Sequence, residues 1–153
     1  MLTVWRLVTV HYAASAFSGD GARLYGGRWN RKGVSMVYTS GTQSLAMLEM
    51  LVQDDPLRAH YVVIPASIPD PVAVERIAVE DLPAGWRRLE ARTQLQERGS
   101  TWALCLSSAV LAVPSAVIPA ESNYLLNPLH PDFAQIEIGE PQAFVTDQRF
   151  FPR

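Results

Sequence analysis

The stretch "GGRWNRKGVSMVYTSGTQSLAMLEMLVQ", residues 26–53, predicts two short strands followed by a helix. The segments "GRWN" (27–30) and "VSMVYTS" (34–40) are the predicted strands, joined by a turn at 31–33. Paired glycines suit a tight turn or a close approach of the backbone to another group. The arginine after them offers a planar fork of donors, so the turn is either solvated or one wall of a site for a phosphate-bearing ligand.

The helix is predicted to begin just after the second strand. The Ser40-Gly41-Thr42 sequence breaks the strand pattern, and Thr42 or Ser44 is suited to the N-cap position because its hydroxyl can accept from a free backbone N–H. We expect the helix to run from about Gln43 to Gln53. It should end before Asp54-Asp55-Pro56, because proline disfavours helical geometry in the residue that precedes it.

The rest of the chain shows more strand signals than helix signals. Strands are predicted at Leu2–Val10, at 60–68, at 71–79, at 109–119 with an interruption at Pro114, and as a terminal strand or hairpin pair at 134–145. Polar, turn-rich loops are predicted at 14–25 and 122–133, and a helical segment at 82–104 with a break at Gly99. Because helices and strands do not alternate regularly, the sequence predicts an α+β fold in one domain, residues 1–153.

Composition and charge exclude several classes of protein. The formal net charge of -2 gives no reason to expect direct binding to nucleic acid or to an anionic membrane. Cys105 is the only cysteine, so no intrachain disulfide can form, which fits the cytoplasm. The first ten residues have neither a basic segment nor a long apolar run, so we expect no signal peptide and no membrane span. The three histidines lie far apart, so no metal site is expected.

Three familiar motifs fail on inspection. The segment Gly19–Leu24 has two glycines of a dinucleotide-binding fingerprint but leucine in place of the third. Gly21 and Gly26 have the spacing of a P-loop, but Gly27-Arg28 stands where Lys-Ser/Thr is required. Ser115, in "VPSAV", lacks the glycines of a nucleophile elbow. A Rossmann site, a P-loop and an ordinary serine hydrolase are therefore not expected.

Glu49 is the only charged or histidine residue between residues 34 and 53. On a helical wheel it falls at the border of the apolar arc formed by Leu45, Leu48 and Leu51. A carboxylate at such a border needs polar partners if the helix is covered, and Arg28 is a candidate partner. An exposed glutamate with its stem on the rim fits the pattern equally well, and the pattern alone does not decide.

Two other groups of residues have both a functional and a structural interpretation. Tyr38 shares a strand face with Met36, and a place in the core or at its rim is the commoner fate of such a tyrosine. Arg28 alone would be read as a surface arginine near a turn. The loop after the last long strand carries polar residues that either satisfy turn backbone groups or face a ligand: Ser115, Asn123, Asn127 and His130.

Taken in order, these segments resemble the RES domain, the toxin half of a bacterial toxin–antitoxin pair, over nearly the whole chain. The resemblance is carried by "WRL" (5–7), "GGRWN..G...VY.S" (26–40), "A.LE.L" (46–51), "VPSAV" (113–117) and "NYLLNP.HP" (123–131). It implies a fold like that of ADP-ribosylating toxins, with a split, mostly antiparallel β core and helices around an NAD cleft. It also implies a partner, an antitoxin with a DNA-binding Xre-like domain whose C-terminal part covers the cleft.

By the same resemblance, the chain consumes NAD by breaking the bond between nicotinamide and ribose, as a glycohydrolase or phosphorylase. Arg28, Tyr38 and Glu49 would be the catalytic residues. The residues expected to bind NAD are Arg6, Arg28, Tyr38, Ser115 and Asn127. An alternative is transfer of ADP-ribose to a specific cellular protein. A non-catalytic nucleotide-binding module is a remote alternative, against which the presence of all three catalytic residues counts.

The chemistry of the reaction gives each residue a hypothetical role. Glu49 would stabilise the cation that develops on the ribose and orient an attacking water. Arg28 would clamp the pyrophosphate by paired hydrogen bonds and keep Glu49 ionised. Tyr38 would stack on the nicotinamide or the ribose, and Ser115 would bond the nicotinamide amide or a ribose hydroxyl.

Overall fold

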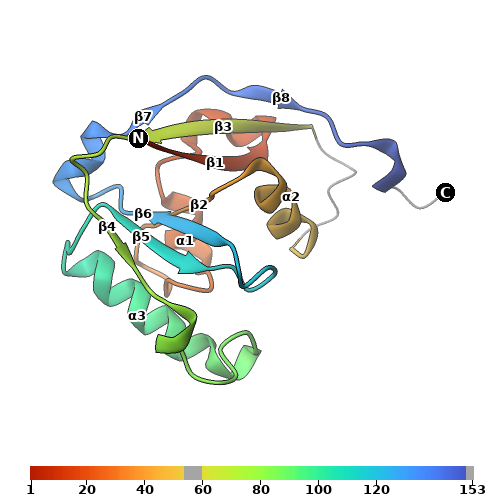
Figure 1. Cartoon of the computed structure of the whole chain (residues 1–153). Coiled ribbons are helices and arrows are strands. Elements are labelled where there is room, and N and C mark those ends of the chain that lie inside the picture. Colours follow the sequence, from red (N-terminus) through yellow and green to blue (C-terminus); the bar gives the residue numbers. More distant parts are fainter. Residues whose placement is uncertain (54–59, 151–153) are drawn as a thin grey trace.

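The computed structural model of the chain describes residues 1–53 and 60–150, and these form one eight-stranded sheet with helices packed around it (Figure 1). The strands are β1 (Leu2–Thr9), β2 (Val37–Ser40), β3 (Tyr61–Ile68), β4 (Val74–Arg76), β5 (Val110–Pro114), β6 (Ser122–Leu126), β7 (Glu137–Ile138) and β8 (Gln142–Phe144). The α-helices are α1 (Asp20–Tyr25), α2 (Gln43–Leu51) and α3 (Arg92–Leu104), and short 3-10 turns lie at Val10–Ser15, Val79–Asp81, Leu89–Ala91, Pro131–Gln135 and Gln148–Phe150.

The strand order is β4-β5-β6-β2-β1-β3-β7, and β8 also pairs with β3. Every pair is antiparallel except β4 with β5. The expected α+β fold with a mostly antiparallel core is thus confirmed. β2 is the strand that joins the two halves of the sheet: its ladder with β1 consists of the single pair Trp5 and Ser40, whereas it pairs with β6 along its whole length.

Two hydrophobic cores pack against the sheet. One is built around β1 and β3 and contains Val4, Ile64 and Ala66, all at most 1% exposed. The other lies between β5, β6 and α3, where Leu95 and Leu125 are fully buried. Burial of each such side chain contributes about 1.5 to 3 kcal/mol. The second core also takes in residues 29–36, and so it fixes the segment that leads into β2.

Several expected boundaries are confirmed. β1 and β3 lie where alternating, β-branched sequence predicted strands, and they pair over eight residues each. Thr42 caps α2, its hydroxyl accepting from the backbone N–H of Leu45 at 3.1 Å. α2 ends at Leu51, two residues earlier than expected, and the expected stop at Asp54-Asp55-Pro56 lies outside the described residues.

Other expectations are wrong, for reasons of tertiary structure. The segment 27–30 is an irregular loop rather than a strand, α1 occupies part of the expected loop at 14–25, and β6 begins inside the expected loop at 122–133. The strand expected at 71–79 is reduced to β4. β7 and β8 pair with β3 rather than with each other.

Gly99 does not break a helix but lies inside α3. A Cβ atom at this position would stand only 1.9 Å from the carbonyl oxygen of Trp29. The glycine therefore allows the backbone of α3 to lie directly against the loop that carries Arg28, a reason that no local pattern contains.

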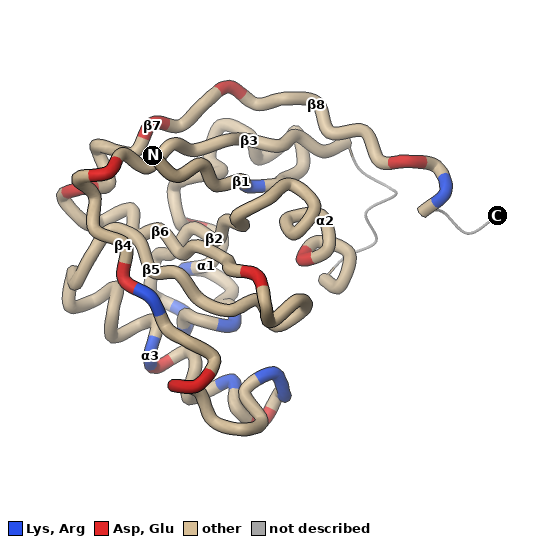
Figure 2. Tube along the Cα trace, in the orientation of Figure 1, with Lys and Arg blue, Asp and Glu red and all other residues tan. Residues whose placement is uncertain are grey.

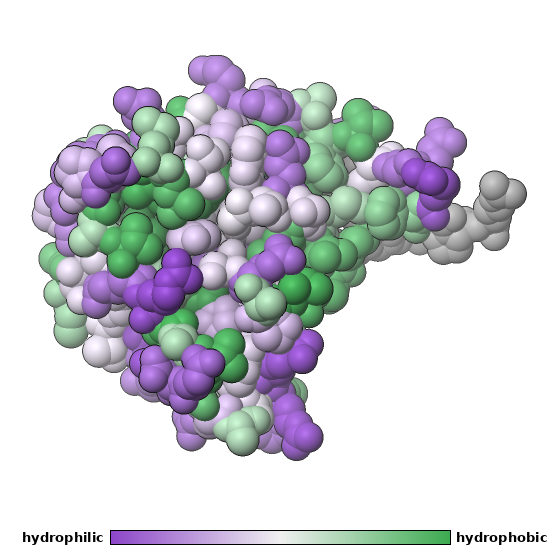
Figure 3. Space-filling model, in the orientation of Figure 1, coloured by the Kyte–Doolittle hydropathy of each residue, from purple (hydrophilic) through white to green (hydrophobic). Residues whose placement is uncertain are grey.

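The surface is of mixed character. On the face drawn in Figure 3, several hydrophobic areas are separated by hydrophilic residues. Basic residues gather where the chain enters α3, at the lower end of the molecule in Figure 2. Among the described residues, no helix is long and apolar enough to cross a membrane.

Candidate active site

The carboxylate of Glu49, near the end of α2, is held by residues from two other segments. Its Oε1 atom accepts a hydrogen bond from the hydroxyl of Ser115 at 2.6 Å and another from the side-chain amide of Asn123 at 2.9 Å. Its Oε2 atom has no hydrogen-bond partner among the described residues, and the side chain as a whole is half-buried. Within the described part of the chain, one oxygen is thus held by the protein and the other is not.

Ser115, just after β5, is fully buried and has a saturated hydroxyl. The oxygen accepts from the backbone N–H groups of Val117 and Ile118, each at 3.1 Å, while its proton goes to Glu49. Both kinds of hydrogen bond of the hydroxyl are satisfied inside the protein, and one of them holds the Glu49 carboxylate. The expected bond from Ser115 to the nicotinamide amide or to a ribose hydroxyl stays a prediction.

The amide of Asn123 is oriented by the sheet. The antiparallel register of β2 and β6 places Asn123 opposite Ser40, whose hydroxyl donates to the amide oxygen at 2.8 Å. That bond leaves the Nδ2 group to face Glu49. In the sequence, Asn123 stands out as a polar residue of the loop but not as one of the residues expected to bind NAD. Its position opposite Ser40 depends on the pairing of two strands that are distant in the sequence.

Tyr38, in β2, uses its hydroxyl within the protein. The group donates to Oδ1 of Asn30 at 2.6 Å and accepts from the backbone N–H of Trp29 at 3.0 Å. Burial raises the pKa of the Tyr38 hydroxyl well above its usual range, so it remains neutral at physiological pH. The hydroxyl therefore holds the loop in place through Trp29 and Asn30, the two residues that follow Arg28. Tyr38 is half-buried, so contact with a ligand would have to be made by its ring.

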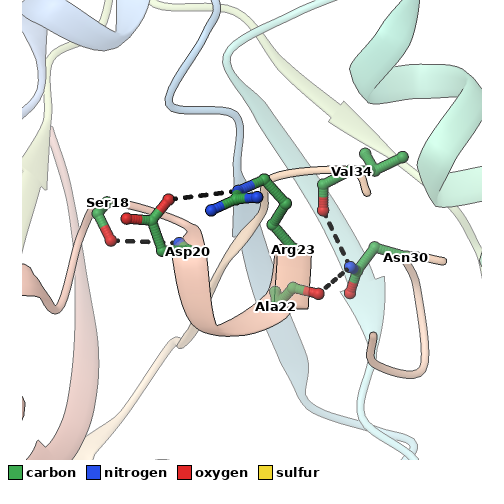
Figure 4. Close-up of polar contacts among 6 residues, drawn as sticks. All are labelled: Ser18, Asp20, Ala22, Arg23, Asn30 and Val34. Carbon is green, nitrogen blue, oxygen red and sulfur yellow. Dashed lines mark hydrogen bonds and ion pairs between the residues drawn. The ribbon is translucent and has the colours of Figure 1, made fainter. Parts of the chain in front are cut away.

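Asn30 is the hub of this loop and was not identified from the sequence. It is fully buried, and its Nδ2 group donates to the carbonyl oxygens of Ala22, Val34 and Arg31 at 2.8, 3.0 and 3.2 Å. Figure 4 shows the first two of these bonds, which connect α1 to the segment before β2. Because a buried amide is costly unless its N–H groups are hydrogen-bonded, these bonds are what allow Asn30 to be buried.

The close-approach turn expected at the paired glycines is confirmed. A Cβ atom on Gly27 would lie 2.5 Å from the Tyr38 hydroxyl oxygen, so a side chain does not fit. Trp29 packs into the second core with 2% exposure, whereas Arg28 points to a hollow shared with Arg88 and Arg92.

Arg28 is not paired with Glu49. The only hydrogen bond of its guanidinium group within the described residues runs from Nη1 to the carbonyl oxygen of Arg87, at 3.5 Å. No ion pair joins Arg28 to Glu49, so the expected direct pairing is absent from the structure. The reason is the fold of 27–30, since a loop rather than a strand beside α2 carries the arginine.

The two other expected binding residues lie in different surroundings. Arg6, in β1, donates from Nη1 to the carbonyl oxygen of Tyr38 at 2.9 Å, and its buried Nε has no partner. Burial lowers the pKa of Arg6 to about 10. Asn127 is 1% exposed, and its amide bonds the backbone of Ala103 and Leu129. The structure thus brings Arg6 close to Tyr38 but gives the amide of Asn127 backbone partners away from Glu49.

Among the described residues, no group of three histidine, cysteine or acidic side chains is placed to hold a metal ion.

Comparison with known proteins matches residues 3–147 to the RES domain family model. "Toxin Res" of Photorhabdus laumondii is 39% identical over 134 residues, which cover 86% of this chain and 85% of that protein. "Toxin Res" of Yersinia enterocolitica is 36% identical over 97% of this chain and 99% of its own length. The "Prs ADP-ribosylating toxin" of Sphingobium sp. is 37% identical, over 95% and 94% respectively.

The fold has a counterpart among solved structures. A chain in the crystal structure of the M. tuberculosis MbcT–MbcA toxin–antitoxin complex matches with a TM-score of 0.75 and 19% sequence identity. The match covers 94% of this chain and 84% of that chain. At this level of identity the likeness supports the fold alone, a curled, mostly antiparallel sheet with few helices.

Proposed function

The chain belongs to the RES domain family, and we propose on that premise that it is the NAD-consuming toxin of a toxin–antitoxin pair. The observation that carries the proposal is the half-buried Glu49 carboxylate, fixed at Oε1 by Ser115 and Asn123 and without a partner at Oε2 among the described residues. Such a carboxylate is suited to a reaction in which positive charge develops on a sugar.

In the proposed reaction the bond between the ribose C1′ atom and the nicotinamide nitrogen breaks. The electron pair stays with nicotinamide, which leaves as a neutral molecule without needing a proton on its ring nitrogen. The ribose becomes cationic, and Glu49 stabilises it and bonds its hydroxyls through Oε2. Water then forms a bond to C1′ and releases a proton to the solvent, which gives ADP-ribose. Alternatively, an anionic oxygen of phosphate forms the bond to C1′, which gives the phosphorylated sugar without release of a proton.

The other residues of the site bind and orient the substrate. Arg28 bonds the pyrophosphate with its guanidinium fork, and the partly exposed ring of Tyr38 stacks on the nicotinamide or ribose. Arg6 supports Tyr38 through the backbone and keeps one donor, Nε, without a protein partner. Asn127 is almost fully buried, and both its amide nitrogen and its amide oxygen bond backbone groups, so we expect any part it takes in binding to be indirect.

A second reaction is favoured by one observation, the name of a relative. The Sphingobium protein that shares 37% identity is called "Prs ADP-ribosylating toxin". Transfer of ADP-ribose to a protein breaks the same bond in NAD and differs only in the nucleophile. The same residues would serve both reactions, and the acceptor would be chosen by the surface around the site.

We propose a cognate antitoxin as the partner of the chain, with an Xre-like domain for DNA and a C-terminal part that covers the site. The proposal is supported by the names of the relatives and by the fold shared with a toxin solved in complex with its antitoxin. The toxin itself carries a net charge of -2 and is given no role in binding DNA.

The products identify the reaction. The purified chain is incubated with NAD labelled in the adenylate half, with and without phosphate, and in parallel with a cell lysate. Free ADP-ribose in both buffers indicates hydrolysis, and a product that requires phosphate indicates phosphorolysis. Label on one protein band indicates transfer to that protein. Intact NAD under all three conditions contradicts the proposed function.

A further inference from the structure

A small hollow beside the site is lined by three arginines and one apolar side chain, Arg28, Arg88, Leu89 and Arg92. Within residues 1–53 and 60–150, none of the three arginines forms an ion pair. Glu90 lies between two of them in the sequence but pairs with neither, and Glu97 pairs with Arg31 instead, at 2.9 Å. Figure 2 shows basic positions gathered in this part of the molecule.

Convergence of three cations on one hollow is unfavourable for the protein alone. Each guanidinium group repels the others, and no carboxylate of the described residues forms an ion pair with any of the three. Burial raises the pKa of the Tyr38 hydroxyl, and the positive charges of Arg92 and Arg28 partly counter that rise. Both arginines are therefore near enough to Tyr38 to interact with it electrostatically. An arrangement of this kind gains stability when an anion occupies the hollow.

Backbone contacts hold the arginines next to the Glu49 site. Arg87 donates from Nε to the carbonyl oxygen of Ala116, the residue after Ser115, at 2.8 Å. The carbonyl oxygen of the same Arg87 accepts from Arg28. Gln96 of α3 donates to the carbonyl oxygen of Gly27, at 2.8 Å. The segment with Arg88 and Arg92 is thereby fastened both to the loop of Ser115 and to the loop of Arg28.

We propose that Arg88 and Arg92 bind the pyrophosphate of the dinucleotide together with Arg28, so that substrate recognition extends to the turn before α3 and its first residue. This inference rests on the proposed function for the identity of the ligand. A pyrophosphate is the part of NAD that matches the chemistry of the hollow, because it offers two negatively charged groups to several forked donors at once. Arg88 and Arg92 are exposed, and neither side chain forms an ion pair with another of the described residues.

The test measures binding rather than turnover, with ADP-ribose as the probe, because it keeps the pyrophosphate and has no nicotinamide to lose. Isothermal titration is carried out on the wild-type chain and on Arg88→Gln and Arg92→Gln. We expect the Kd for ADP-ribose to rise by roughly 5- to 30-fold in each variant. Arg98→Gln is the matched control, because Arg98 lies on the same helix but bonds the carbonyl oxygen of Asp81, and its Kd should stay within about twofold of wild type.

Three results would overturn the inference: no binding of ADP-ribose by the wild-type chain, an unchanged Kd in both hollow variants, or an equal loss in Arg98→Gln. The same proteins are also titrated with inorganic phosphate. If Arg88→Gln and Arg92→Gln weaken binding of inorganic phosphate but not of ADP-ribose, the inference is overturned in favour of a site for free phosphate. Nicotinamide riboside, which has no phosphate, should bind all four proteins alike. Failure of the proposed function is distinguishable, since NAD would then remain intact while ADP-ribose binding still depended on the arginines.

Discussion

The hydroxyl oxygen of Ser115 lies 2.6 Å from Oε1 of Glu49, although the two residues are 66 positions apart in the chain. The contact joins the loop after β5 to α2, and it leaves the serine with no free hydrogen-bonding capacity. From this contact we expect Ser115 to act through Glu49. Its loss should harm the reaction by disordering the carboxylate, while the affinity for the pyrophosphate end of the substrate should change little.

Replacing Ser115 by alanine tests this relationship. We expect kcat/KM for NAD to fall about 10- to 100-fold, mainly through kcat, because Glu49 loses one of its two partners. The backbone N–H groups of Val117 and Ile118 also lose their acceptor, so the free energy of unfolding should fall by about 1 to 3 kcal/mol. Ser44→Ala, at an exposed position in the first turn of α2, is the control and should leave both quantities near wild type. Wild-type kcat in Ser115→Ala would show that the contact plays no part in turnover.

Asn123→Asp tests the second partner of Glu49. The substitution places another carboxyl group at the position from which the amide now donates at 2.9 Å. Two carboxyl groups so close share a proton, so the acid limb of the kcat/KM profile should move to higher pH by about 1 to 3 units. Asn123→Ala removes the amide without adding charge, and should lower activity with little movement of the limb. Identical profiles in the two variants would contradict this arrangement.

Tyr38→Phe tests the burial of the tyrosine hydroxyl. Burial raises the folded-state pKa of Tyr38 above its value of about 10 in the unfolded chain. The stabilisation is therefore present in full below pH 10 and is lost as the pH rises toward the folded-state pKa. We expect the unfolding free energy of the wild type to fall above pH 10 by up to about 1.4 kcal/mol per pH unit more steeply than that of the variant. Chemical denaturation between pH 9 and 11.5 measures both slopes, and parallel slopes would contradict the burial.

Gly99→Ala tests the close approach of α3 to the loop of Arg28. The added Cβ would stand 1.9 Å from the Trp29 carbonyl oxygen, so the helix must move away, at an expected cost of more than about 3 kcal/mol in unfolding free energy. Gly21→Ala is the matched control, because it also lies in a helix, α1, and nothing lies within 4 Å of the added atom. Its stability should stay the same or rise by up to about 1 kcal/mol. Equal melting temperatures for the two variants would refute the contact.

The elements with local signals could be predicted from the sequence. β1 and β3 are rich in β-branched residues, and α2 begins at a threonine that caps it. The loop at 27–30 and the course of α3 could not be predicted, because both depend on one contact between Trp29 and Gly99. Local propensity gives glycine in a helix a cost but cannot show the distant carbonyl that requires it.

The sequence supplied candidate residues for the site, whose roles stay predictions, but it did not supply their contacts. Glu49 stood out as a lone charge in an apolar helix, and Ser115 entered through the family resemblance. Asn30 gave no signal apart from its place in "GGRWN", since a buried amide that bonds three carbonyl groups looks like any turn asparagine in the sequence. The expected partnership of Arg28 with Glu49 failed because it assumed a strand where the chain forms a loop.

The most direct test of the central claim compares NAD consumption by the wild-type chain, Glu49→Gln and Glu140→Gln, with nicotinamide release followed by chromatography. Glu140 is an exposed residue between β7 and β8, so its substitution removes the same charge far from the site. The proposed function predicts nicotinamide release by the wild type and by Glu140→Gln, and a loss of at least about 100-fold in Glu49→Gln with an unchanged circular dichroism spectrum. Equal release by all three proteins would contradict the role of Glu49.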